Sequence, residues 1–214
     1  MKNVGTVASA FFCCFVSLIT GCTNSGNTTN SQTASEPSET WKLYASAQNN
    51  CEYQAPGEPI QQKFRAEHPL GPIEICIESI DKGEQVFQVT MTDYPKGFVE
   101  QAASTQEAVL EKAAASGLEA RAGAKQIKFD AISIDRKPGY LQEYEYPEGA
   151  DYPAGYAWIK GILVSDGMLL MQVDASAEYV EKNNEKCKAD CKKFFDSLKM
   201  TSALAEENGA EPTE

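Results

Sequence analysis

The sequence predicts an α+β fold with a mainly antiparallel sheet. Apolar and polar residues alternate over several short stretches, which is the two-residue period of half-buried strands. Turn residues separate these stretches closely enough for consecutive strands to form hairpins. Two other stretches carry apolar residues three and four positions apart, which is the period of a helix that packs on a sheet.

The first elements are strands. A short strand begins at Cys51 and ends at the turn 55–57. Residues 73–91 predict a β-hairpin with one apolar face, because apolar side chains occupy every second position on both sides of the turn 81–84. These apolar positions are Ile73, Ile75, Ile77, Phe87, Val89 and Met91.

A helix is predicted to follow. Ser104 and Glu107 have the spacing of a capping box, in which the serine oxygen accepts a hydrogen bond from a free amide and the glutamate reaches back. Gly117 and Leu118 predict the helix end, because glycine adopts the left-handed conformation and leucine makes the accompanying contact. The buried stripe between these signals is Val109, Leu110, Ala113 and Ala114.

Three or four strands and a second helix are predicted in the rest of the chain. The candidate strands are 126–134, 139–146, 156–164 and 168–175. Turn residues at 137–139 and 165–167 join them. The helix is expected to run to Met200 and to pack on the sheet through Val180, Cys187, Cys191, Phe194, Phe195 and Leu198.

Residues 1–21 predict a lipoprotein signal peptide. Lys2 supplies the positive charge, and the apolar run 7–19 is shorter than the about 20 residues that a membrane span needs. The junction Ile19-Thr20-Gly21-Cys22 resembles the bacterial lipobox, so we expect cleavage before Cys22 and lipidation of its thiol. The alternative is an ordinary secretory signal, or an uncleaved anchor, that contains a cysteine.

The predicted lipid on Cys22 would anchor the mature chain, since two or three acyl chains hold a protein stably at a membrane. Thr23 stands where aspartate would resemble an inner-membrane retention signal, so we expect a cell-envelope protein at the outer membrane, facing the periplasm. Residues 22–40 predict a flexible tether, and 202–214, with four glutamates, a disordered acidic tail. Residues 41–201 then form a single α/β domain.

The charge and the motifs limit the possible functions. The chain has 19 basic and 31 acidic residues, and its net charge of -12 opposes binding to nucleic acid. We expect no cofactor and no metal, because the spacing of Cys187 and Cys191 is not Cys-x2-Cys and His68 is the only histidine. Nucleophile-elbow, phosphate-loop, dinucleotide and zinc-protease motifs are absent, so the chain is not expected to be an enzyme.

Four cysteines remain in the predicted domain: Cys51, Cys76, Cys187 and Cys191. An even number in an oxidising compartment predicts two disulfides, with three possible connectivities. Cys187 and Cys191 lie one helical turn apart, where the geometry for a mutual disulfide is poor. Either Cys51 pairs with Cys76 and the helical pair stays buried, or both helical cysteines reach the strand cysteines.

Residues 144–158 are the candidate binding surface, because aromatic side chains dominate binding hot spots. The candidates are Tyr144, Tyr146, Tyr152, Tyr156 and Trp158. The alternative is a long hairpin whose rings fold onto the domain edge. Neighbouring carboxylates would suit a glycosidase, namely Glu143, Glu145, Glu148 and Asp151. However, alternation places Glu143 and Glu145 opposite the tyrosines, as on a solvated strand face.

The order of several short motifs resembles the Mog1/PsbP-like domain. They are Tyr53-x-x-Pro56-Gly57-x-Pro59, Asp93-Tyr94-Pro95, a helix, the turn Pro138-Gly139, a late hairpin and Phe194-Phe195-Asp196-Ser197-Leu198. The resemblance covers about residues 48–200 and implies an α-β-α sandwich around an antiparallel sheet. Members of this family include a photosystem II extrinsic subunit and a partner of a nuclear GTPase, neither with an active site.

Two functions are therefore expected as alternatives. The first is a membrane-anchored, non-catalytic module that binds or assembles an envelope protein partner. The second is a small-ligand or carbohydrate binder, or else a hydrolase, that uses the aromatic segment and its carboxylates.

Overall fold

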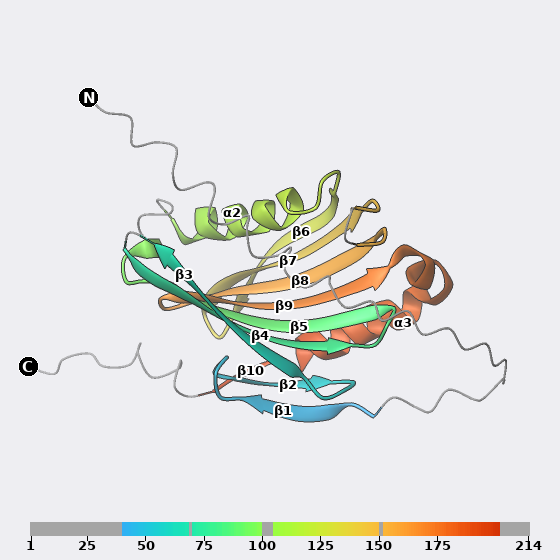
Figure 1. Ribbon diagram of the computed structural model, residues 1–214, viewed down its shortest axis with the longest axis horizontal. Helices are drawn as coiled ribbons and strands as arrows, with labels where there is room; N and C mark the ends of the chain where they lie inside the picture. The colour runs from blue at the N-terminus through green and yellow to red at the C-terminus, as the bar shows by residue number, and fades with distance from the viewer. Residues whose placement is uncertain (1–39, 69, 100–104, 150–151, 202–214) are drawn as a thin grey trace, which may run out of the picture.

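The fold is described from a computed structural model, which describes residues 40–68, 70–99, 105–149 and 152–201 (Figure 1). Three predicted segments lie outside the described residues: the signal peptide 1–21, the tether 22–40 with Cys22, apart from Thr40, and the tail 202–214.

The main sheet has seven strands, and every neighbouring pair is antiparallel. From one edge to the other they are β3 (Ile60–His68), β4 (Gly71–Asp81), β5 (Gln85–Asp93), β9 (Gly167–Ser176), β8 (Gly155–Val164), β7 (Lys137–Tyr146) and β6 (Lys125–Ile134). A second sheet has three strands, β1 (Lys42–Ser46), β2 (Cys51–Ala55) and β10 (Lys199–Met200), with β2 in the middle.

Two helices, α2 (Gln106–Glu119) and α3 (Ala177–Asp196), lie on opposite faces of the main sheet (Figure 1). Side chains along β8 point alternately to the two faces of the sheet, so the two helices lie over different residues of this strand. Ala157 and Ile159 belong to the apolar cluster under α2, whereas Trp158 and Ile162 belong to the cluster under α3. A mostly antiparallel sheet with two helices confirms the predicted α+β class.

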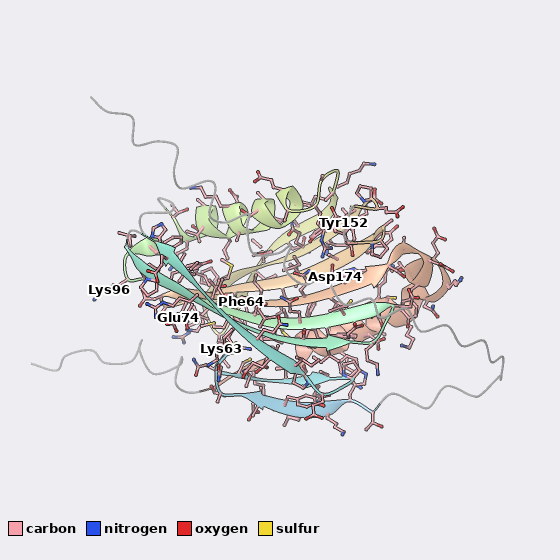
Figure 2. All side chains as sticks on the ribbon, viewed as in Figure 1. Lys63, Phe64, Glu74, Lys96, Tyr152 and Asp174 are labelled. Atoms are coloured by element: carbon pink, nitrogen blue, oxygen red, sulfur yellow. The ribbon has the colours of Figure 1, made fainter. Side chains whose placement is uncertain are left out.

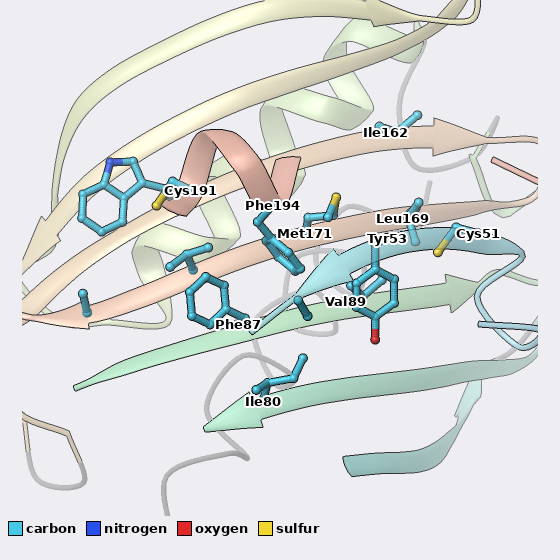
Figure 3. Packing of buried hydrophobic residues seen from close by; sticks show 14 of the residues in the cluster. Cys51, Tyr53, Ile80, Phe87, Val89, Ile162, Leu169, Met171, Cys191 and Phe194 are labelled. Atoms are coloured by element: carbon cyan, nitrogen blue, oxygen red, sulfur yellow. The ribbon is translucent and has the colours of Figure 1, made fainter. Parts of the chain in front are cut away.

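The largest apolar cluster lies between the main sheet, α3 and the small sheet (Figure 3). Tyr53 from β2 and Phe194 from α3 are fully buried, and their ring centroids are 5.9 Å apart in an edge-to-face arrangement. Phe87 from β5 packs edge-on against Phe194 at 5.4 Å. Because aromatic side chains bury large areas, these three rings join all three elements in one core.

Polar contacts also hold the small sheet against the main sheet. Glu78 on β4 is 7% exposed and accepts hydrogen bonds from the Ser46 hydroxyl at 2.7 Å and the Tyr53 hydroxyl at 2.8 Å. The amide of Gln61 donates a third hydrogen bond to it at 3.1 Å. Burial, and then the hydrogen bond to Glu78, raise the pKa of Tyr53, so this hydroxyl remains a proton donor.

The predicted signals for the ends of α2 are wrong. The N-cap is Thr105, whose side chain accepts a hydrogen bond from the Ala108 amide at 3.2 Å, while Ser104 lies outside the described residues. Serine and threonine can both cap a helix through the side-chain oxygen, so spacing alone does not decide between the two adjacent candidates. Gly117 lies within α2, and the left-handed glycine is Gly123, with φ +83°.

Helix α3 ends at Asp196 and does not continue to Met200. Lys199 and Met200 instead form β10, which pairs with Glu52 and Cys51 on β2. The pairing satisfies backbone groups that a longer helix would have bonded internally. Strands β1 and β3 were not predicted, and His68 ends β3, where its Nδ1 accepts a hydrogen bond from the Leu70 amide at 3.2 Å. Among the described residues, neither helix is long and apolar enough to cross a membrane.

Candidate functional site

The five aromatic residues of the predicted binding surface do not form one surface. Tyr144, Tyr146 and Trp158 are at most 8% exposed, and only Tyr152 and Tyr156 are half-buried. Tyr144, Tyr146 and Tyr152 join the cluster under α2, whereas Tyr156 and Trp158 join the cluster under α3. The expected surface is corrected accordingly, because alternation along β7 and β8 sends most of these rings into two separate cores.

Arg121, just after α2, lies at the centre of the three tyrosines under α2. Its guanidinium carbon is 4.0 Å from the ring centroid of Tyr146, 5.7 Å from that of Tyr144 and 5.8 Å from that of Tyr152. A guanidinium over an aromatic face is attracted by the ring's negative π-surface, most strongly where water is excluded. We call Arg121, Asp174 and these three tyrosines the Arg121 cluster; Figure 2 labels two of its members, Tyr152 and Asp174.

Asp174 on β9 supplies the opposite charge. Arg121 Nη1 donates to Asp174 Oδ1 at 2.5 Å, and the two side chains are only 12% and 18% exposed. The Tyr146 hydroxyl donates to the same oxygen at 3.4 Å, and the Gln172 amide donates to Oδ2 at 2.5 Å. Burial by itself would lower the pKa of Arg121, but the attraction of Asp174 outweighs this effect, so the pKa of Arg121 is raised. Arg121 therefore stays charged, and the hydrogen bonds of the pair are made within the fold.

Two phenols of the Arg121 cluster, Tyr144 and Tyr146, are poorly suited to proton transfer. Burial is the largest cause that raises the pKa of both Tyr144 and Tyr146 above the ordinary phenol value. The Tyr144 hydroxyl is buried and has no hydrogen-bond partner among the described residues. The one carboxylate of the cluster is paired with arginine and these phenols hold their protons, so the contacts of the cluster fix the positions of the segments that carry these residues.

Tyr152 is the tyrosine of the Arg121 cluster that is partly exposed at the surface. Its ring lies edge-on to Tyr146 at 5.6 Å, and its carbonyl accepts a hydrogen bond from the Gly149 amide at 2.9 Å. A Cβ on Gly149 would lie 2.4 Å from the Tyr152 ring, so only glycine permits this approach. The Ala177 amide also ties this loop to the start of α3 through the Ala154 carbonyl, at 2.9 Å. The ring is therefore held in place by the fold itself.

The predicted carboxylate cluster is divided by the sheet. Glu143 and Glu145 are half-buried on the face of β7 opposite the buried Tyr144 and Tyr146, which confirms the alternation. Glu145 lies 3.7 Å from Lys125 Nζ, Glu148 is exposed, and Asp151 lies outside the described residues. The carboxylate that does join the tyrosines is Asp174, which no sequence pattern indicated. Its partner Arg121 is 53 residues away, and no local motif connects them.

The four predicted disulfide cysteines are free thiols in the structure, which corrects the expectation of two disulfides. Cys51, Cys187 and Cys191 belong to the core cluster under α3, where Cys51 and Cys191 lie at opposite ends (Figure 3). Cys76 instead contacts the side chains of Gln48 and Gln61, at 3.5 Å each. A disulfide needs its two Cα atoms within about 7 Å, and the separation of Cys51 from Cys191 agrees with their free state.

We expect alkylation to count four free thiols in the domain. Burial, and then the charge of Glu78, raise the pKa of Cys51 to about 12, so little thiolate forms at about pH 8. Cys187 and Cys191 are buried, whereas Cys76 is half-buried. Mass spectrometry after iodoacetamide treatment should show Cys76 modified first in the folded protein and all four modified after unfolding without reductant. A pair that reacts only after reduction would reveal a disulfide and contradict the expectation.

Metal-ligating residues do not gather in the described part of the chain. No group of three or more His, Cys, Asp or Glu side chains that could hold a metal ion occurs among these residues.

The fold is similar to that of cyanobacterial PsbP (CyanoP) from Synechocystis sp. PCC 6803, determined in solution. The alignment covers 79% of this chain and 98% of that chain, with 12% identity and a TM-score of 0.51. A crystal structure of a protein of unknown function from Pseudomonas aeruginosa, described as a putative regulator, aligns over 81% of this chain and 99% of that chain, with 12% identity and a TM-score of only 0.37. No family model and no curated protein matches the sequence. The CyanoP alignment supports a Mog1/PsbP-like fold and, at this identity, nothing beyond the fold.

Proposed function

We propose that this chain, a Mog1/PsbP-like domain, is a membrane-anchored envelope lipoprotein that binds or assembles a protein partner without catalysing a reaction. In this proposal residues 1–21 are removed, the lipid sits on Cys22, and residues 22–40 tether the domain to the outer membrane on its periplasmic side. Helices on opposite faces of the sheet support the α-β-α sandwich that the family resemblance implies.

The partly exposed ring of Tyr152 is the observation on which the proposal depends. This half-buried ring packs against the cluster under α2, and the same segment carries two exposed prolines, Pro147 and Pro153. Tyrosine is enriched in binding hot spots because it offers a large amphipathic surface with few rotatable bonds. Contacts to Tyr146 and Gly149 already fix this ring, so a partner would lose little conformational entropy in ordering it.

The electrostatics of the same cluster support a role in binding rather than in catalysis. A general acid or base needs a pKa near the working pH and a free path for its proton. Asp174 is held by Arg121 at 2.5 Å, and burial moves the pKa of Tyr144 and Tyr146 away from neutrality. These groups instead fix the positions of Arg121 and Tyr146, which contact the ring of Tyr152.

The variant Tyr152→Ala is expected to lose the protein partner while keeping the fold. Affinity purification of the wild type from detergent-solubilised envelopes, read by quantitative mass spectrometry, should recover a specific protein. Truncating a hot-spot residue costs about 2 kcal/mol or more, so Tyr152→Ala should weaken binding of that protein by more than tenfold.

The matched control is Tyr156→Ala, because Tyr156 is also half-buried but packs in the cluster under α3, with its ring stacked on Trp158 at 6.1 Å. It should recover the partner at the wild-type level. Equal recovery with both variants would refute the assignment to Tyr152. Recovery of no protein, together with ligand-dependent thermal stabilisation, would favour the small-ligand alternative.

A further inference from the structure

Polar side chains cross the middle of the main sheet, where apolar ones are expected. Strands β5 and β9 are the third and fourth of seven, and their faces toward α3 are apolar. Their opposite faces carry Gln88, Thr90, Gln172 and Asp174. Polar residues enclosed on central strands are informative because burying an amide or hydroxyl without a hydrogen bond costs free energy.

The strand register gathers these side chains into one strip. Ser79 on β4 pairs with Gln88 on β5, which in turn pairs with Gln172 on β9. Directly paired residues point to the same face, with their Cβ atoms about 5 Å apart. Thr90 and Asp174 lie two positions along the same strands, on the same face. We call Ser79, Gln88, Thr90, Gln172 and Asp174 the polar strip.

Hydrogen bonds within the polar strip fix the two amides. Gln88 Nε2 donates to Thr90 Oγ1 at 2.7 Å, and Gln172 Nε2 donates to Asp174 Oδ2 at 2.5 Å. Thr90 and Gln172 are 8% and 7% exposed, which restrains their positions, whereas Ser79 and Gln88 are half-buried. The amide nitrogens of Gln88 and Gln172 thus donate within the strip, and each amide keeps its carbonyl oxygen as an acceptor. The hydroxyls of Ser79 and Thr90 can both donate and accept hydrogen bonds.

The polar strip lies beside α2 on the same face of the main sheet. On this face α2 packs on β7 and β8. The apolar cluster of Ile73, Ile75 and Ile77 lies on the same face of β4, and Ile77 pairs directly with Thr90. On the other side Thr90 pairs with Leu170 on β9 and Gln172 pairs with Ile159 on β8, so apolar side chains flank the strip.

The polar strip carries no net charge, although the chain as a whole has a charge of -12. Its one carboxylate, Asp174, is neutralised by Arg121 at 2.5 Å. What remains is a row of amide oxygens and hydroxyls one strand apart, about 4.8 Å. Fixed polar groups of this kind set the orientation of a small ligand, and neutral ones favour a ligand without charge.

We propose that the polar strip binds a neutral, hydroxyl-rich ligand of the oligosaccharide class. Ligand hydroxyls would donate to the carbonyl oxygens of Gln88 and Gln172 and exchange hydrogen bonds with Ser79 and Thr90. The polar strip shares Asp174 with the Arg121 cluster, but Tyr152, to which the protein-binding role is assigned, is not part of the strip.

The test uses the full-length mature protein in a detergent without a sugar headgroup, so that the detergent does not compete. Calorimetric titrations with maltotriose, cellotriose and triacetylchitotriose should reveal binding of at least one neutral trisaccharide. Gln172→Leu and Thr90→Val should each weaken that binding about tenfold, since each removes one hydrogen-bonding group. Thr90→Val keeps the side-chain shape, so it tests the site even if Gln172→Leu perturbs folding.

The control variant is Gln54→Leu, which removes a half-buried amide on β2 of the small sheet and should leave trisaccharide binding unchanged. The melting temperature of each variant without ligand shows that the fold is kept. Absence of binding by all three trisaccharides would overturn the proposal. Equal binding by wild type, Gln172→Leu and Thr90→Val, or a preference for the charged trigalacturonate, would overturn it as well.

Discussion

The variant Arg121→Met is expected to unfold with a free energy about 3–5 kcal/mol below that of the wild type, the usual effect of breaking a buried ion pair. The substitution leaves the charge of Asp174 uncompensated at 18% exposure and removes the cation 4.0 Å from the centroid of the Tyr146 ring. Methionine retains much of the apolar stem, so the loss should come mainly from the charge. Urea unfolding monitored by circular dichroism measures the difference.

Two further variants separate the buried charge from general effects of substitution. Adding Asp174→Asn to Arg121→Met should recover part of the lost stability, because no uncompensated charge then remains. Lys182→Met breaks a surface pair with Glu178, whose side chains are 67% and 78% exposed, and should leave stability nearly unchanged. If Arg121→Met behaved like Lys182→Met, the Arg121 cluster would not be a structural centre.

The same ion pair connects stability with the proposed binding role. Arg121 contacts the ring of Tyr152, and Asp174 accepts from Tyr146, which supports that ring. Loss of the arginine should therefore weaken partner binding even at a temperature where the variant is fully folded. A folded Arg121→Met protein that binds its partner normally would indicate that Tyr152 is held by other contacts.

Strong periodicity explains which elements were predictable from the sequence. The hairpin of β4 and β5 and the strands β7 to β9 are largely half or fully buried, so their apolar residues repeat clearly. Strand β3 is an edge strand in which six of nine residues are exposed, so its alternation is weak. Strand β10 has two residues, and only its pairing with β2 distinguishes it from a helix end.

The candidate site was predictable only in part. Composition alone drew attention to residues 144–158, and alternation placed Glu143 away from the tyrosines. Arg121 and Asp174 could not be linked to this segment, because their contact depends on how α2 and β9 meet in the fold. The polar strip is even less visible in the sequence, since it requires the register of three strands whose residues are far apart in the chain.

The variant Cys22→Ser is expected to pass from the membrane fraction to the soluble fraction, because serine offers no thiol for the proposed lipid. Lipidation with two or three acyl chains gives stable anchoring, and the acidic chain is repelled by anionic lipid headgroups. Fractionation with immunoblotting, together with metabolic labelling by a clickable palmitate analogue, measures both properties. Cys14→Ser, within the predicted signal peptide, is the matched control and should leave labelling and anchoring intact. If Cys22→Ser were processed yet stayed in the membrane fraction, the contact with the membrane would have to come from the domain itself.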